Sequence, residues 1–224
     1  MSGVCARVAP LACVVLCAAP AMAGMIDQSS LPDGANMAMV MDDGVNITVS
    51  STGGNFKKKT VNGVQATGIS GGSVNGEIDG DEMMLFEFDQ AVTITSLSIA
   101  HLYTDGEFGD NGDETAAFLV AETMGGSTVT FELEATTATM GTWSGLGTAT
   151  NDSIATEAGG GAWTISGTDI FGQQVVSVKL VSGNAGNQAK FGDYGFRSLS
   201  FIPTPASAGV LAAAGICALR RRRA

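Results

Sequence analysis

The chain has 224 residues, of which 45% are hydrophobic, so it is long enough to bury the core of one domain of ordinary size. All 22 acidic residues but only six of the 11 basic residues lie between residues 24 and 202, so this region carries a net charge of −16. Such an acidic region excludes nucleic acid and anionic surfaces as partners, because binding to phosphate depends on clustered Lys and Arg.

Cysteines are confined to the two ends of the chain. Cys5, Cys13 and Cys17 lie in an N-terminal apolar segment, and Cys217 lies in a C-terminal one. The region between them therefore has no disulfide framework, no thiolate metal site and no cysteine nucleophile.

Residues 1–23 have the pattern of a secretory signal peptide. Arg7 precedes an apolar run over residues 11–19, and Ala21 and Ala23 form a small-residue cleavage site before Gly24. We expect a signal helix that signal peptidase removes after Ala23. A transmembrane anchor is the alternative, although the run is shorter than the roughly 20 residues that span a bilayer.

Short runs of alternating apolar and polar residues recur between residues 24 and 202, as in strands with one buried face. A change of phase between Ile94 and Leu97 predicts a β-bulge near Thr95 and Ser96. The predicted buried faces comprise Ile47 and Val49; Met84, Phe86 and Phe88; Val129, Phe131 and Leu133; Val176, Val178 and Leu180; and, in a closing strand, Leu199 and Phe201.

Turn dipeptides separate these runs: Asp43-Gly44, Asn62-Gly63, Gly71-Gly72, Asn75-Gly76, Asp105-Gly106 and Gly125-Gly126. The sequence therefore predicts an all-β domain over residues 24–202, a β-sandwich of the jelly-roll type, between an N-terminal signal helix and a C-terminal hydrophobic helix. A β-solenoid is the alternative fold, but the sequence lacks the fixed repeat that a solenoid needs.

Two acidic segments, 77–82 and 105–114, are candidate ligand loops. Clustered carboxylates beside glycines suit Ca²⁺, and the alternative is an exposed, hydrated loop. A pair of carboxylates could also cleave a glycosidic bond, but the sequence does not give their separation. The predicted calcium ligands are Asp105, Glu107, Asp110, Asp113 and Glu114.

Aromatic residues and the one histidine give few further candidates. Trp143 lies in a loop-like, glycine-flanked segment and is the candidate platform for a carbohydrate such as exopolysaccharide, whereas Trp163 alternates with Ile165 as a core residue does. His101 continues the phase of Leu97, so we expect it to pack near the core rather than to bind a ligand.

The C-terminal segment, residues 203–224, has three parts in order. The motif Pro203, Thr204, Pro205, Ala206 and Ser207 stays extended, the apolar stretch 208–219 can enter a bilayer, and an arginine cluster stops transfer. The apolar stretch is short for a stable span, which favours a transient membrane association over a plain anchor. The arginine cluster consists of Arg220, Arg221, Arg222 and Arg223.

This C-terminal arrangement resembles the PEP-CTERM sorting tails of Gram-negative bacteria, in the Pro-Thr-Pro-Ala-Ser form of planctomycete-like organisms. Tails of this kind also go under the name of an ice-binding-protein C-terminal domain, which implies no ice binding. The resemblance implies processing by an exosortase-like enzyme near residues 203–205, although Thr204 stands where the family has Glu. Residues 77–88, 105–114 and 193–201 resemble domains that precede such tails and have no assigned activity.

Taken with this resemblance, the sequence predicts an exported, non-enzymatic protein of the cell surface or extracellular matrix, with an acidic domain that is a candidate for binding calcium. Its expected partners are signal peptidase, an exosortase-like enzyme and exopolysaccharide. The alternative is a secreted carbohydrate-binding module or a glycoside hydrolase.

Overall fold

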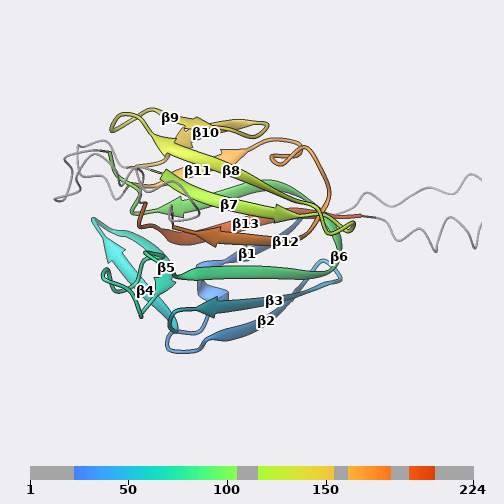
Figure 1. Ribbon diagram of the computed structural model, residues 1–224, viewed down its shortest axis with the longest axis horizontal. Coiled ribbons are helices and arrows are strands. Elements are labelled where there is room, and N and C mark those ends of the chain that lie inside the picture. Colours follow the sequence, from blue (N-terminus) through green and yellow to red (C-terminus); the bar gives the residue numbers. More distant parts are fainter. Residues whose placement is uncertain (1–22, 105–115, 154–160, 183–191, 205–224) are drawn as a thin grey trace, which may run out of the picture.

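A computed structural model describes residues 23–104, 116–153, 161–182 and 192–204, and this part of the chain is all-β. Thirteen strands form one hydrogen-bonded sheet in which every pairing is antiparallel (Figure 1). Apart from one 3₁₀ turn, η1 (Gln28–Ser30), the described residues contain no helix. The predicted terminal helices fall outside the described residues.

The strands in chain order are β1 (Gly24–Asp27), β2 (Met37–Asp42), β3 (Val45–Thr52), β4 (Phe56–Val61), β5 (Val64–Ile69), β6 (Met83–Ala100), β7 (Ala116–Glu122), β8 (Thr128–Ala135), β9 (Gly141–Trp143), β10 (Thr148–Asn151), β11 (Trp163–Ser166), β12 (Val175–Val181) and β13 (Gly195–Pro203).

The longest strand, β6, connects the two parts of the sheet. Its first half pairs with β3 on one side and β12 on the other, whereas its second half pairs with β13 and β11. Figure 1 shows that β6 curves back on itself between these halves. The sheet therefore bends around a core to which both halves of β6 contribute.

The predicted β-bulge in β6 is confirmed. Ser200 pairs with Ser96 and Phe201 pairs with Ile94, so Thr95 has no opposite residue in β13. The extra residue shifts the phase of the strand, and Ile94 and Leu97 are consequently both buried.

The predicted apolar faces are largely confirmed. Met84, Phe86 and Phe88 are buried, and the ring of Phe86 packs against Phe196 at a centroid distance of 4.8 Å. Two residues depart from the prediction. Val129 is 41% exposed near the start of β8, and Val176 is not buried because the register of β12 shifts between Val175 and Ser177.

Two predicted hairpin turns are confirmed by their backbone angles. Asp43 and Gly44 between β2 and β3, and Asn62 and Gly63 between β4 and β5, all have positive φ values. Two consecutive residues with positive φ are what a type I′ turn requires, and Asn-Gly and Asp-Gly tolerate this conformation best.

The closing strand β13 is confirmed at Gly195–Pro203, and it lies inside the sheet rather than at an end of it. β13 pairs with β6, β5 and β1, and in the last of these pairings Gly24 lies opposite Phe201. The first and last strands are therefore neighbours, and the described chain begins and ends at the same end of the molecule (Figure 1). In the described part of the chain, no helix is long and apolar enough to cross a membrane.

Candidate functional site

Most of the predicted ligand and targeting residues lie outside the described residues. These are the calcium candidates Asp105, Glu107, Asp110, Asp113 and Glu114, the cleavage-site residue Ala21, the motif residues Pro205, Ala206 and Ser207, and Arg220 to Arg223. Ala23 is described, and it immediately precedes β1. Pro203 is the last residue of β13, and the Thr204 amide donates to the carbonyl of Ala91 at 3.0 Å. Of the predicted motif, Pro203 therefore belongs to the sheet, and Thr204 is joined to it by a backbone hydrogen bond.

Trp143 is not the loop residue that its glycine neighbours indicate. It ends strand β9, and its ring stacks on Phe131 at 5.5 Å and contacts Phe171 at 6.2 Å. The indole Nε1 donates to the carbonyl of Leu146 at 2.9 Å. The Trp143 ring therefore packs against other aromatic side chains. Trp163 is buried in the core, as predicted.

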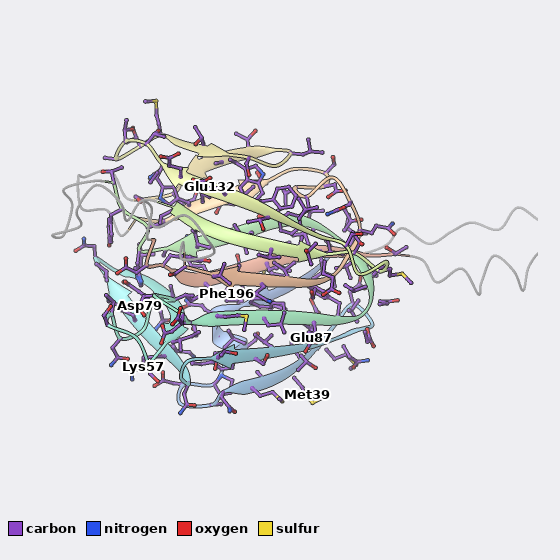
Figure 2. All side chains as sticks on the ribbon, in the orientation of Figure 1. Met39, Lys57, Asp79, Glu87, Glu132 and Phe196 are labelled. Carbon is purple, nitrogen blue, oxygen red and sulfur yellow. The ribbon has the colours of Figure 1, made fainter. Side chains whose placement is uncertain are left out.

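The acidic segment 77–82 is not an exposed, hydrated loop. Glu77, Asp79 and Glu82 are all buried, in the segment that leads into β6. Figure 2 shows Asp79 at the end of the molecule where β6 begins. Because a buried carboxylate is unfavourable unless it is hydrogen-bonded or protonated, each of these side chains must find a donor or a proton.

Asp79 and Glu82 find three of their four donors in residues 71–76, which we call the glycine-rich loop. Asp79 accepts hydrogen bonds from the Ser73 hydroxyl and the Val74 amide, and Glu82 accepts from the amides of Gly71 and Asp79. The buried oxygens therefore hold residues 71–79 in one conformation. The burial of the Asp79 and Glu82 carboxylates is explained by these hydrogen bonds to the loop.

Glycines in this region are required by close packing. A Cβ atom on Gly72 would overlap the carboxylate of Asp79, and a Cβ atom on Gly68 would overlap the backbone of Glu77. The glycines thus let the 77–82 segment lie directly against β5, which brings Glu77 to Lys59 on the neighbouring strand β4.

Glu77 is at the centre of a polar cluster drawn from distant parts of the chain. Its Oε1 lies 2.7 Å from Nζ of Lys59 on β4 and 3.3 Å from Nδ1 of His101, which directly follows β6. Asp193, two residues before β13, also makes a side-chain hydrogen bond with Glu77. We call Lys59, Glu77, His101 and Asp193 the polar cluster.

Burial has the larger effect on Glu77. Desolvation raises the pKa of its carboxyl group to about 7, against the opposing effect of the Lys59 hydrogen bond and charge, and the neighbouring Asp193 raises it further. Two carboxyl groups in hydrogen-bond contact share a proton rather than both ionise. Glu77 is therefore largely protonated below neutral pH, although an amine lies beside it.

His101 is buried in a strained backbone conformation, with a φ of 69°. Its Nε2 lies 3.4 Å from the carbonyl of Val64, a distance at which an Nε2–H would donate. Desolvation lowers the pKa of the imidazole to about 4, so the ring is neutral at pH 7. The unprotonated Nδ1 then lies beside Oε1 of Glu77 but makes no hydrogen bond with it.

The polar cluster combines a protonated carboxyl group, a second carboxyl group, an amine and a neutral imidazole. These groups can transfer protons between one another, and the amine is a nucleophile once it is deprotonated. Among the described residues, no group of three or more His, Cys, Asp and Glu side chains is arranged to hold a metal ion.

Sequence reasoning missed most of this cluster. His101 was expected to be packed near the core, and it is, but nothing local marks Lys59 within the run of Lys57, Lys58 and Lys59. Lys59 lies on β4 opposite Ala66 of β5, and no local pattern distinguishes it from its two lysine neighbours. Asp193 is more than 100 residues from Glu77 in the chain, so their contact depends on the fold.

The chain matches no known family model, and a search of curated proteins gives no relative.

Proposed function

We propose that the chain is an exported, non-enzymatic protein of the cell surface or extracellular matrix. The observation that carries the proposal is where the sheet begins and ends. β1 starts at Gly24, directly after the expected cleavage site, and β13 ends at Pro203, where the expected sorting tail begins. The strands fill the interval between two segments that have the pattern of removable targeting signals.

The pairing of Gly24 with Phe201 gives this arrangement a physical use. Both targeting segments would leave the domain from one end, so a precursor held in the membrane by its tail could present the whole sheet outside the bilayer. An exosortase-like enzyme could then reach residues 203–205 without unfolding more than the end of β13.

The non-enzymatic part of the proposal is supported by the way in which buried carboxylates are used. Asp79 and Glu82 accept hydrogen bonds from backbone amides rather than facing an open site. A carbohydrate platform at Trp143 has less support, since the ring packs against Phe131 and Phe171. Of the two readings, the surface or matrix protein fits these contacts better.

We also propose that the bent sheet is a β-sandwich. In support, β6 pairs with different neighbours in its two halves, and Phe86 and Phe88 from the first half pack against Phe196 and Phe201 of β13. Aromatic contacts of this kind are expected where two layers face one core.

Processing is the direct test of the proposed function. We expect protein recovered from the envelope or medium of the native cells to begin at Gly24 and to lack the segment after residues 203–207, as measured by intact mass and terminal peptide sequencing. Disruption of the exosortase-like gene should leave the longer, membrane-bound form. Recovery of the full chain from the cytoplasm would contradict the proposal.

Calcium binding is tested separately on the secreted protein. If the predicted ligands in 105–114 bind Ca²⁺, calorimetric titration gives a heat of binding and chelation lowers the melting temperature. Replacing Asp110 and Asp113 with Asn should remove both effects. A melting temperature that chelator does not change, with no heat of binding, would remove calcium from the proposed function.

A further inference from the structure

Lys59 and Glu77 form an unusually close and sheltered pair. The amine nitrogen lies 2.7 Å from Oε1, and the two side chains are 30% and 6% exposed. A carboxyl group this deeply buried is mostly shielded from water, while the adjacent amine is held against it by the register of β4 and β5. The amine is thus held in contact with the carboxyl group, which is the proximity that an attack of Nζ on Cδ needs.

A second carboxyl group completes the arrangement. Asp193 is hydrogen-bonded to Glu77, so a proton carrier stands beside the same carboxyl group that the amine contacts. His101 lies 3.3 Å from Oε1 and closes the cluster toward the core. The three reactive groups, on Lys59, Glu77 and Asp193, therefore come from separate segments that the folded sheet brings together.

We propose that Lys59 and Glu77 become joined by an intramolecular isopeptide bond between Nζ and Cδ, with Asp193 carrying the protons. The bond is a modification of this chain by its own residues. It needs no oxidant, no cofactor and no external enzyme.

The reaction balances with the groups present. Lys59 gives one ammonium proton to ionised Asp193, and the neutral amine attacks Cδ of protonated Glu77. The tetrahedral intermediate loses one Glu77 oxygen as water, which takes up a proton from the attacking nitrogen, so the Cδ–O bond breaks as the Nζ–Cδ bond forms. The products are an amide and one water molecule, and the proton left on Asp193 passes to solvent.

The protonation state of Glu77 favours this step. An amine attacks a neutral acid far more readily than a carboxylate anion, and burial raises the pKa of Glu77 to about 7. Lys57 and Asp33 on the same strand and its neighbouring loop give the contrast. The Lys57 and Asp33 side chains are 42% and 47% exposed, and Nζ lies 3.3 Å from Oδ2. A hydrogen bond from the Lys58 amide lowers the pKa of the Asp33 carboxyl group.

The bond would also serve the domain. Between residues 24 and 202 the sequence has no cysteine, so a disulfide is not available to an exported fold. An isopeptide bond between Lys59 and Glu77 would fasten β4 to the segment that follows the glycine-rich loop.

Mass spectrometry of the full-length protein, expressed and purified as the intact chain, tests the proposal. The expected result is an intact mass lower than that of the unmodified chain by one water molecule. Trypsin alone cannot separate Lys59 from Glu77, because residues 60–178 contain no Lys or Arg. After denaturation and digestion with thermolysin, which cleaves before Val, Ile and Ala within residues 60–76, Lys59 and Glu77 should be recovered in one branched peptide. Separate, unmodified peptides and an unchanged intact mass would overturn the proposal.

Variants locate the bond and test the proton carrier. Lys59→Arg keeps the positive charge and should lose the branched peptide completely, whereas the matched control Lys57→Arg should retain it. Asp193→Asn should slow formation of the bond roughly a hundredfold, the effect of removing a general acid or base. A branched peptide in Lys59→Arg would overturn the assignment of the amine, and bond formation at the normal rate in Asp193→Asn would overturn the role of Asp193.

Discussion

Burial changes the acid–base behaviour of Glu77 and His101 in opposite directions. Desolvation favours the neutral form of each, so the pKa of the carboxyl group rises to about 7 and that of the imidazole falls to about 4. Lys59 and Asp193 act on Glu77, and Lys59 and Arg197 act on His101. The unfolded chain has the ordinary values, 4.5 and 6.5, so both groups link folding to pH in the chain whose Glu77 carboxyl group is free of the isopeptide bond.

The signs of the two contributions differ. Folded Glu77 holds its proton between about pH 4.5 and 7 when the unfolded chain has lost it, so its contribution to stability falls as pH rises through that window. Folded His101 stays neutral between about pH 4 and 6.5 when the unfolded chain is protonated, so its contribution rises with pH. The two effects oppose each other over most of this range.

Removing the Glu77 carboxyl group should therefore expose the His101 contribution. In a Lys59→Arg background, where Glu77 cannot form an isopeptide bond, adding Glu77→Gln should make the free energy of unfolding rise more steeply between pH 5 and 6.5. Urea denaturation at several pH values measures this slope. Glu87→Gln, on the exposed face of β6, is the matched control, and equal slopes with and without Glu77→Gln would contradict the prediction.

At the scale of single elements, β5 lies so close to the 77–82 segment that Gly68 cannot carry a side chain without displacing backbone. Gly68→Ala should lower the free energy of unfolding by about 1–3 kcal/mol, the usual cost of overpacking. Gly125→Ala is the control, because its Cβ would meet no atom nearer than 3.8 Å, and it should change stability by no more than about 0.5 kcal/mol. Urea denaturation measures the free energy of unfolding of both variants. Equal values for Gly68→Ala and Gly125→Ala would contradict the close contact between β5 and the 77–82 segment.

The outer face of β2 makes a second element-scale prediction. Met37, Met39 and Met41 alternate along this strand and are 56%, 79% and 75% exposed, with Met39 on the outer side of β2 (Figure 2). Dilute hydrogen peroxide should oxidise these three to sulfoxides well before buried Met84, since oxidation follows exposure. Peptide mass spectrometry over time measures the order, and denaturant should abolish it. Equal rates in the native protein would contradict the exposure of this face.

Local sequence patterns predicted individual strands and turns because these depend on neighbours in the chain. The alternation of Met84, Phe86 and Phe88 and the Asp43-Gly44 and Asn62-Gly63 turns needed no tertiary information. Tertiary information was needed for the position of β13 inside the sheet and for the full length of β6, since both depend on pairings between distant strands. Trp143 was misread because glycine neighbours indicate a loop, whereas contacts with Phe131 and Phe171 determine its environment.

The candidate site was predictable only in part for the same reason. Acidity identified the 77–82 segment, but the sequence could not tell buried carboxylates from hydrated ones. That distinction depends on the amides of the glycine-rich loop and on Lys59 of β4, which meet the carboxylates only in the folded chain.

At the scale of the whole molecule, the proposed isopeptide bond should raise stability. A link that closes a loop of about 15 to 20 residues stabilises by roughly 3 kcal/mol in the chain-entropy account. Lys59→Arg should therefore unfold at lower urea concentration than the unsubstituted protein, by about that free energy, while Lys57→Arg should not. If both variants match the parent, the link makes no contribution to stability.

The neighbouring positions of Gly24 and Phe201 decide how the domain would respond to mechanical load. β13 runs from Gly195, which pairs with Ala100 near the polar cluster, to Pro203, which pairs with Val92 at the opposite end. A force applied between Pro203 and the end of the domain near the polar cluster acts along β13. This direction is at right angles to the hydrogen bonds of β13 with β1 and β6, so these bonds share the force and must break together. Traction between Gly24 and Pro203 would instead open the β1 pairing one rung at a time. The same domain would thus resist pulling between Pro203 and its far end, and would yield when Gly24 and Pro203 are pulled apart.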